Sequence, residues 1–231
     1  MFGATSPLPM SRSLRVLAAL LGYPGAELRS HLAEMRDLLR IEAAVSHSRR
    51  AELDALIDAL HRADPLDTES DYVELFDRGR ATSLSVFEHV HGDSRERGPA
   101  MIDLGETYAK AGLLLHENEM PDHLPVVLEY ASTQPPREAK AFLGEIAHIL
   151  NVVFAALQQR HSAYASVLGA LLDLAGEHAQ PVKPVIDAPI DESWAEPVVF
   201  DGCSTQGQAR PGQPQPIHVV RRNPAAQGAS A

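Results

Sequence analysis

Apolar residues recur along most of this chain at the spacing of an α-helix. Leu14, Leu17, Ala18 and Leu21 follow one another at intervals that place all four on one face of a helix. A Gly-Tyr-Pro-Gly sequence at 22–25 ends this stripe abruptly, because glycine and proline both disrupt helices. Two more stripes follow with the same spacing: Leu28, Leu32, Met35, Leu38 and Leu39, and then Leu53, Leu56, Ile57 and Leu60.

The middle of the chain continues the helical pattern in shorter pieces. We expect two short helices at 69–77 and 85–91. A longer helix is expected through Lys110, with Ser94 as its N-cap and Gly112 as the residue that ends it. The middle of the chain therefore predicts helices joined by connectors rather than a sheet.

The later part of the body is also helical by pattern. Asp122 is a candidate cap for a helix at 122–132. A long apolar stripe then covers 142–157, and a last helix is expected at 162–175. No alternating strand pattern appears before Gly176. The sequence therefore predicts an all-α fold, a single-domain bundle of about eight or nine helices.

The two ends of the chain differ from this body in composition. We expect a flexible N-terminus at 1–11, an all-helical domain at 12–176 and a Pro-rich, partly disordered tail at 177–231. The tail holds nearly half of the 17 prolines and has no amphipathic stripe, so packing there cannot offset the entropy lost on ordering. One cluster in it is apolar enough to dock onto the body: Trp194, Val198, Val199 and Phe200.

Charge and cysteine content exclude several classes of protein. The chain has 20 Lys and Arg against 31 Asp and Glu, a net charge of -11. This charge argues against nucleic-acid binding and favours basic partners. The single cysteine, Cys203, excludes an internal disulfide framework. No apolar run is long enough to span a bilayer and no signal peptide is recognisable, so we expect a cytoplasmic protein without direct membrane insertion.

The motif search finds no catalytic constellation of high specificity. The glycine-rich phosphate loops, the nucleophile elbow and the His-Glu-x-x-His zinc motif are all missing from the sequence. His116 and His123 flank a loop and could converge on a metal with Glu117 or Asp122 as an oxygen ligand. A metal-dependent helical hydrolase is therefore an alternative, although solvated surface histidines explain the same residues more simply.

One segment combines acidic and apolar character. Residues 116–130 place three acids and two histidines in a loop that leads into a helix. An acidic loop beside an apolar helix face is a plausible seat for a basic amphipathic peptide. The apolar face of that helix would carry Leu124, Val127, Leu128 and Ala131.

Several sequence segments together resemble a known family. The chain reads DYVELFDRG at 71–79, FEHVHGDSRERG at 87–98 and MPDHLP at 120–125, with LLGYP at 20–24 near its start. In order and spacing these segments are similar to the NarJ-type nitrate reductase assembly chaperones, within the TorD/DmsD-like family of redox-enzyme maturation proteins. The resemblance covers about residues 12–176.

This resemblance implies an all-helical chaperone without catalysis or a cofactor of its own. Its partner would be the catalytic (alpha) subunit of respiratory nitrate reductase, bound through a basic amphipathic N-terminal segment during molybdenum cofactor insertion and before membrane attachment. A chaperone for another molybdoenzyme, or an adaptor that binds the mature enzyme equally well, are alternatives. By resemblance the client-peptide site would include Glu119, Asp122, His123, Leu124 and Pro125, in and next to the MPDHLP segment. It would also include Tyr72, Phe76 and Asp77 from the DYVELFDRG segment.

Overall fold

The computed structural model describes residues 9–92, 94–117 and 119–180, and this part of the chain forms ten α-helices without a β-strand. The prediction of an all-α fold is confirmed, with ten helices where about eight or nine were expected. Two short helical turns, η1 and η2, join α4 to α5. In chain order the elements are α1 (Ser11–Leu20), α2 (Ala26–Glu42), α3 (His47–Arg62), α4 (Pro65–Tyr72), η1 (Val73–Asp77), η2 (Arg80–Thr82), α5 (Val86–His91), α6 (Arg97–Lys110), α7 (Leu124–Thr133), α8 (Pro136–Glu145), α9 (Ala147–Gln159) and α10 (Ala165–Ala175).

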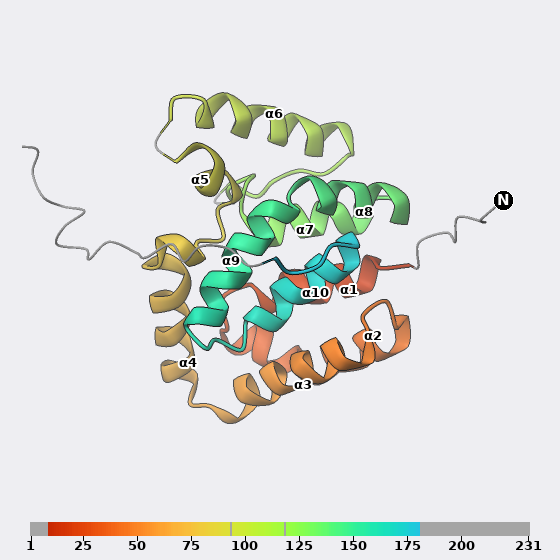
Figure 1. Cartoon of the computed structure of the whole chain (residues 1–231), viewed down its shortest axis with the longest axis vertical. Coiled ribbons are helices and arrows are strands. Elements are labelled where there is room, and N and C mark those ends of the chain that lie inside the picture. Colours follow the sequence, from red (N-terminus) through yellow and green to blue (C-terminus); the bar gives the residue numbers. More distant parts are fainter. Residues whose placement is uncertain (1–8, 93, 118, 181–231) are drawn as a thin grey trace, which may run out of the picture. The chain divides into compact units, whose positions relative to one another are not determined.

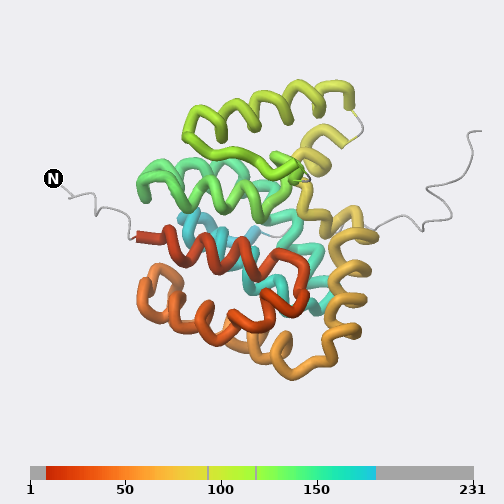
Figure 2. Tube along the Cα trace, turned by 180° about the vertical axis from the view of Figure 1, so that it is seen from behind, coloured from red at the N-terminus to blue at the C-terminus, as the bar shows by residue number. Residues whose placement is uncertain are grey.

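The helices α1, α7 and α10 form the centre of this bundle. α1 packs against α2 and α7, and α10 packs against α3, α8 and α9. In Figures 1 and 2 the α2–α3 pair therefore lies on one side of α1 and α10, and the α7–α8 pair lies on the other. α10 is apolar almost all round, which is typical of a helix that is enclosed by others. Its Leu168 and Leu171 and the α1 residues Leu14 and Leu17 are completely buried.

The long apolar stripe at 142–157 is divided between two helices. α8 and α9 meet at Ile146 with a bend of 65°. Each half packs against different neighbours: α8 contacts α7 and α10, whereas α9 contacts α10, η2 and α5. The stripe thus predicted helix correctly, but its spacing carried no signal for the bend. No single helix among the described residues is long and apolar enough to cross a membrane, and α8 with α9 meets that test only as a bent pair.

The expected helix at 69–77 changes its winding at Val73, where α4 continues into the π-helical turn η1. The chain then passes very close to itself, because a Cβ on Gly79 would lie 2.6 Å from the carbonyl oxygen of Leu75. The Thr82 hydroxyl donates to that same oxygen. This tight crossing fixes the end of η1, in which Phe76 is buried.

The helix α6 contrasts with the centre of the bundle. Figure 1 shows it above α7 and α8, and Tyr108 is its one fully buried side chain. Ile102, on the same helix, is 65% exposed. The helix begins at Arg97 and ends at Lys110, as the sequence predicts for its end. The N-cap prediction for Ser94 is wrong, because Glu96 occupies the cap position and the Ser94 hydroxyl accepts instead from the Glu96 amide at 3.2 Å, before the helix.

Two sequence predictions fall on residues that the structure does not describe. The N-terminal residues 1–8 and the apolar cluster at 194–200 lie outside the described residues. The division of the chain at 11 and 176 stays a prediction. α1 begins at Ser11, and α10 ends at Ala175.

Candidate functional site

The loop before α7 is tied to the connector before α5 by backbone hydrogen bonds. The Val86 amide donates to the Asp122 carbonyl at 2.9 Å, and the Leu124 amide donates to the Leu84 carbonyl at 2.8 Å. Ser85 and His123 thereby form an isolated antiparallel bridge. The MPDHLP segment at 120–125 is thus joined to the residues that directly precede the FEHVHGDSRERG segment at 87–98.

Asp122 has a different role from the predicted helix cap. His123 occupies the cap position of α7 and makes no side-chain cap bond there. The completely buried Asp122 instead accepts a hydrogen bond from the Phe87 amide at 3.2 Å, in the first turn of α5. Arg97 lies 3.6 Å from the same carboxylate oxygen, Oδ2. The cap prediction is wrong because the loop pairing directs this carboxylate toward a helix 35 residues earlier in the chain.

A small hollow of about 290 Å³, which we call the polar hollow, lies where the DYVELFDRG segment (71–79) approaches the MPDHLP segment (120–125). Tyr72 and Phe76 form part of its wall, with ring centroids 4.9 Å apart, and both side chains are largely buried. Asp77 is exposed and His123 is half-buried, so both present polar atoms to the hollow. The remaining lining residues are Ser83, Leu84, Ser85 and Glu88.

The environment of His123 favours its neutral form. Burial lowers the pKa of His123 from its ordinary value, because the charged imidazolium loses solvation. The carboxylates of Asp122, Glu119 and Asp77 oppose this shift without reversing it. The ring is therefore uncharged near neutral pH and can both donate and accept a hydrogen bond.

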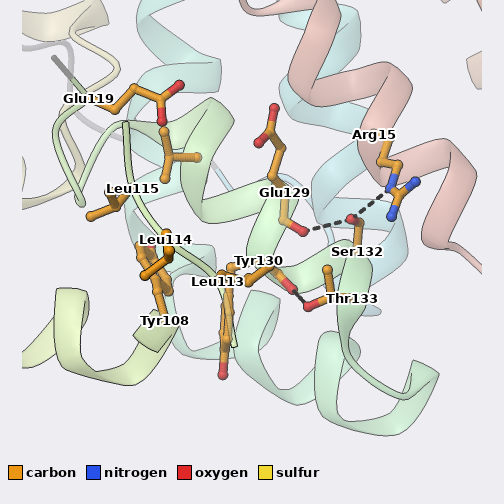
Figure 3. Close-up of a pocket in the computed structure, with 11 residues that line it drawn as sticks. Arg15, Tyr108, Leu113, Leu114, Leu115, Glu119, Glu129, Tyr130, Ser132 and Thr133 are labelled. Carbon is orange, nitrogen blue, oxygen red and sulfur yellow. Dashed lines mark hydrogen bonds between the residues drawn. The ribbon is translucent and has the colours of Figure 1, made fainter. Parts of the chain in front are cut away.

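A second cavity of about 390 Å³, the apolar pocket, lies between α7 and the segment that precedes it. Figure 3 shows leucines 113–115 on one side of this pocket and Arg15 on the other. Tyr108 closes its base, where its hydroxyl donates to the Pro121 carbonyl at 2.9 Å and its ring lies 5.0 Å from that of Tyr130. Besides Arg15 and the tyrosines, the polar members of the lining are Glu119, Glu129, Ser132 and Thr133.

The structure distributes the predicted site residues over several environments. Glu119 lines the apolar pocket, whereas Tyr72, Phe76, Asp77 and His123 line the polar hollow. Asp122 and Leu124 are buried behind them, and Pro125 is half-buried in the first turn of α7.

The apolar face of α7 that seemed open to a peptide packs against α1 instead. Leu128 and Ala131 on this face have no exposed area. The opposite face of α7 borders the apolar pocket with Val126, Glu129, Tyr130 and Thr133. Sequence reasoning missed this set, although its spacing of three, four and seven residues is the helical signal that could have found it.

The metal-site alternative finds no geometric support in the part of the chain that the structure describes, where no group of three or more His, Cys, Asp and Glu residues could hold a metal ion. Asp122 points to the α5 amide and Arg97. Glu119 accepts a hydrogen bond from the His116 backbone amide at 3.2 Å, which stabilises the loop turn.

The fold of this chain is also found in a solved structure. A solved structure of a putative redox enzyme maturation protein from Archaeoglobus fulgidus shares it with a TM-score of 0.52, covering 77% of this chain and all of that one. At 19% identity this likeness concerns the fold alone.

The sequence comparison is more specific. The sequence profile of the nitrate reductase delta subunit family matches residues 42–168, and the chain belongs to this family. The nitrate reductase molybdenum cofactor assembly chaperone NarJ of Escherichia coli strain K12 is 46% identical over 70% of this chain and 69% of its own length. The probable chaperones NarW of that strain and NarJ of Bacillus subtilis strain 168 are 40% and 30% identical, over 71% and 68% of this chain and 68% and 84% of their own lengths. These relatives are named as assembly chaperones and not as enzymes, and the predicted resemblance is confirmed.

Proposed function

We propose that this protein is a cytoplasmic chaperone for the apo catalytic subunit of respiratory nitrate reductase. It binds the N-terminal segment of that subunit and supports molybdenum cofactor insertion before the enzyme attaches to the membrane. Family membership and the 46% identity to the Escherichia coli chaperone support this proposal. Such a role requires selective binding and timely release rather than a catalytic group.

The observation that carries the proposal is the polar hollow. Two segments about 45 residues apart in the chain meet there and contribute Asp77 and His123 as accessible polar groups. We assign direct contact with the client to these two residues and to Glu119 on the adjoining loop. The buried Tyr72, Phe76, Asp122 and Leu124 and the half-buried Pro125 would shape the site from behind.

The charge of the protein supports a basic client segment. A net charge of -11 attracts Lys and Arg residues and accelerates their encounter with the site. A segment that becomes ordered on binding loses conformational entropy, which keeps its affinity moderate. Moderate affinity allows the chaperone to release the subunit once assembly is finished.

The test is calorimetric titration of the full chain with a peptide that copies the first 20 or so residues of the catalytic subunit. Replacing Asp77→Asn removes a charge from the polar hollow and should weaken binding by about fivefold, as expected for the loss of one partly exposed ion pair. Glu74→Gln is the matched control, because Glu74 lies in the same turn η1 but pairs with Arg78 at 3.1 Å.

The assembled enzyme provides the second arm of the experiment. A chaperone that lets go after assembly binds the peptide and not the mature, cofactor-loaded enzyme, whereas an adaptor would bind both equally. Failure of the wild-type chain to bind the peptide at all would refute the proposal. Equal affinities of the Asp77→Asn and Glu74→Gln variants would refute the location of the site.

A further inference from the structure

The apolar pocket is separate from the polar hollow, since the two cavities share no lining residue. They are linked through the short loop before α7, with Glu119 lining the apolar pocket and His123 lining the polar hollow. The family signatures do not include the leucines at 113–115 or the outer face of α7.

We infer that the apolar pocket is a second subsite for the client segment, which takes a large apolar side chain next to a lysine or arginine. This inference rests on the proposed function, because it concerns the same client. It assigns specificity to Glu129 and Leu114, which sequence reasoning did not select.

The apolar half of the subsite is built from a run of leucines that is unusual for an exposed connector. Leu114 is 93% exposed, while Leu113 and Leu115 are half-buried. Covering such a side chain removes apolar surface from water and is favourable. The pocket volume of about 390 Å³ is within the range of cavities that bind ligands and has room for one large side chain.

The polar half of the subsite calls for a cation. Glu119 and Glu129 reach the pocket from two different elements (Figure 3). Glu119 accepts a backbone hydrogen bond from His116, and neither carboxylate forms an ion pair within 4 Å among the described residues. Arg15, the cation across the pocket, donates to the Ser132 hydroxyl at 3.3 Å. Burial and the charge of Glu119 raise the pKa of Glu129, and Arg15 only partly opposes this. A lysine or arginine placed between the two carboxylates would offset the repulsion between them and so oppose the rise in the Glu129 pKa.

Charge also decides between the possible occupants. The apolar cluster of the tail, residues 194–200, is flanked by Asp191, Glu192 and Asp201 and contains Glu196, without a Lys or Arg. A second copy of the chain would bring another net charge of -11. Both would add negative charge to a pocket whose lining already holds two carboxylates against one guanidinium. A basic partner segment is the complementary occupant.

The experiment titrates the full chain with the same client peptide used above. Glu129→Gln should weaken binding by about fivefold and Leu114→Asn by about threefold to tenfold, through loss of an ion pair and of apolar contact. The matched controls are Glu117→Gln, in the same loop but outside both cavities, and Leu66→Asn, an equally conspicuous leucine on α4 that is 75% exposed. Both controls should stay within about twofold of the wild type.

A double-mutant cycle identifies the charge partner. Each Lys and Arg of the peptide is replaced by Gln in turn, and the affinity of each variant peptide is measured for the wild-type chain and for Glu129→Gln. For one of these peptides the two affinities should be equal, because the partner of Glu129 has been removed. Wild-type binding with unchanged affinities for both pocket variants would overturn the subsite and leave the proposed function intact. Absence of wild-type binding would instead refute the proposed function itself.

The two other possible occupants of the apolar pocket, the tail and a second copy of the chain, can be detected in the same samples. Trp194 is the only tryptophan of the chain. A red shift of its emission on Leu114→Asn substitution without peptide would show that the tail fills the pocket, and it would overturn the inference. A dimer in sedimentation that this substitution dissociates would overturn it in favour of a second copy. An unchanged emission and a monomer are the expected results.

Discussion

The centre of the bundle and its outer arm are stabilised in opposite ways. The centre (α1, α7 and α10) buries leucines completely, as Leu14 on α1 and Leu128 on α7 show. The arm (α5, α6 and the connector 111–117) buries little, and Ile102 on α6 remains 65% exposed. One helix of the centre, α7, also faces the arm, because its inner face packs against α1 and its outer face borders the apolar pocket. The well-packed centre thus positions one wall of the apolar pocket, and the arm, which has few buried side chains, supplies the other.

Both helices of the arm contact the loop before α7: α5 through the Val86 and Phe87 amides, which donate to Asp122, and α6 through two further contacts. The Tyr108 hydroxyl donates to the Pro121 carbonyl at 2.9 Å, and the Arg97 guanidinium lies 3.6 Å from the Asp122 carboxylate. Regions with few buried contacts open at low free-energy cost, independently of the rest of the protein. We therefore expect the arm and the centre to respond differently to substitution.

The largest difference is expected from truncating a leucine at the centre. Leu128→Ala should lower the free energy of unfolding by about 3 kcal/mol, because it leaves a cavity in a fully packed site. Ile102→Ala in the arm should change it by less than about 0.5 kcal/mol. Urea denaturation of the two variants measures both values. A loss below about 1 kcal/mol for Leu128→Ala would contradict the contrast.

A smaller effect is expected from removing one hydroxyl in each region. Tyr108→Phe removes the bond to Pro121 and should cost about 1 kcal/mol, confined to the arm. Hydrogen exchange of the α6 amides should then accelerate by about fivefold while the α1 amides keep their rates. Tyr72→Phe, which removes a 2.7 Å bond to the Leu21 carbonyl at the core, should instead lower the global free energy of unfolding. Equal acceleration in α1 and α6 for Tyr108→Phe would show that the arm is not an independent unit.

The smallest effect is a pH dependence at the junction of the two regions. Burial lowers the pKa of His123 in the folded state, so the unfolded chain binds more protons below its ordinary pKa of 6.5. The contribution of His123 to stability is therefore complete above that value and is lost as pH falls toward the lower folded pKa. His123→Gln should lose less stability than the wild type between pH 7 and pH 5.5. Parallel curves for the two proteins in thermal unfolding would contradict this assignment.

Local spacing predicted the helices but not their winding or their breaks. The stripe of Leu14 and Leu17 is enough to identify α1, because each helical turn depends on residues three and four apart. The π-helical turn at Val73 was not predictable in this way, since Gly79 and Thr82 determine it by crossing over the Leu75 carbonyl. The same holds for Asp122, whose acidic side chain before a helix looks like a cap. Its actual partner is the Phe87 amide of another helix.

The sequence by itself determined the helical class, the positions of most helices and the family. These follow from periodicity and from short segments read in order. Only the tertiary structure decided which face of α7 is buried and that two cavities flank the loop before it. The apolar pocket combines Arg15, the segment around leucines 113–115 and the outer face of α7, which are distant in the chain. Their meeting depends on how whole helices pack, because the burial of apolar surface is not directional and residue spacing cannot specify the partner.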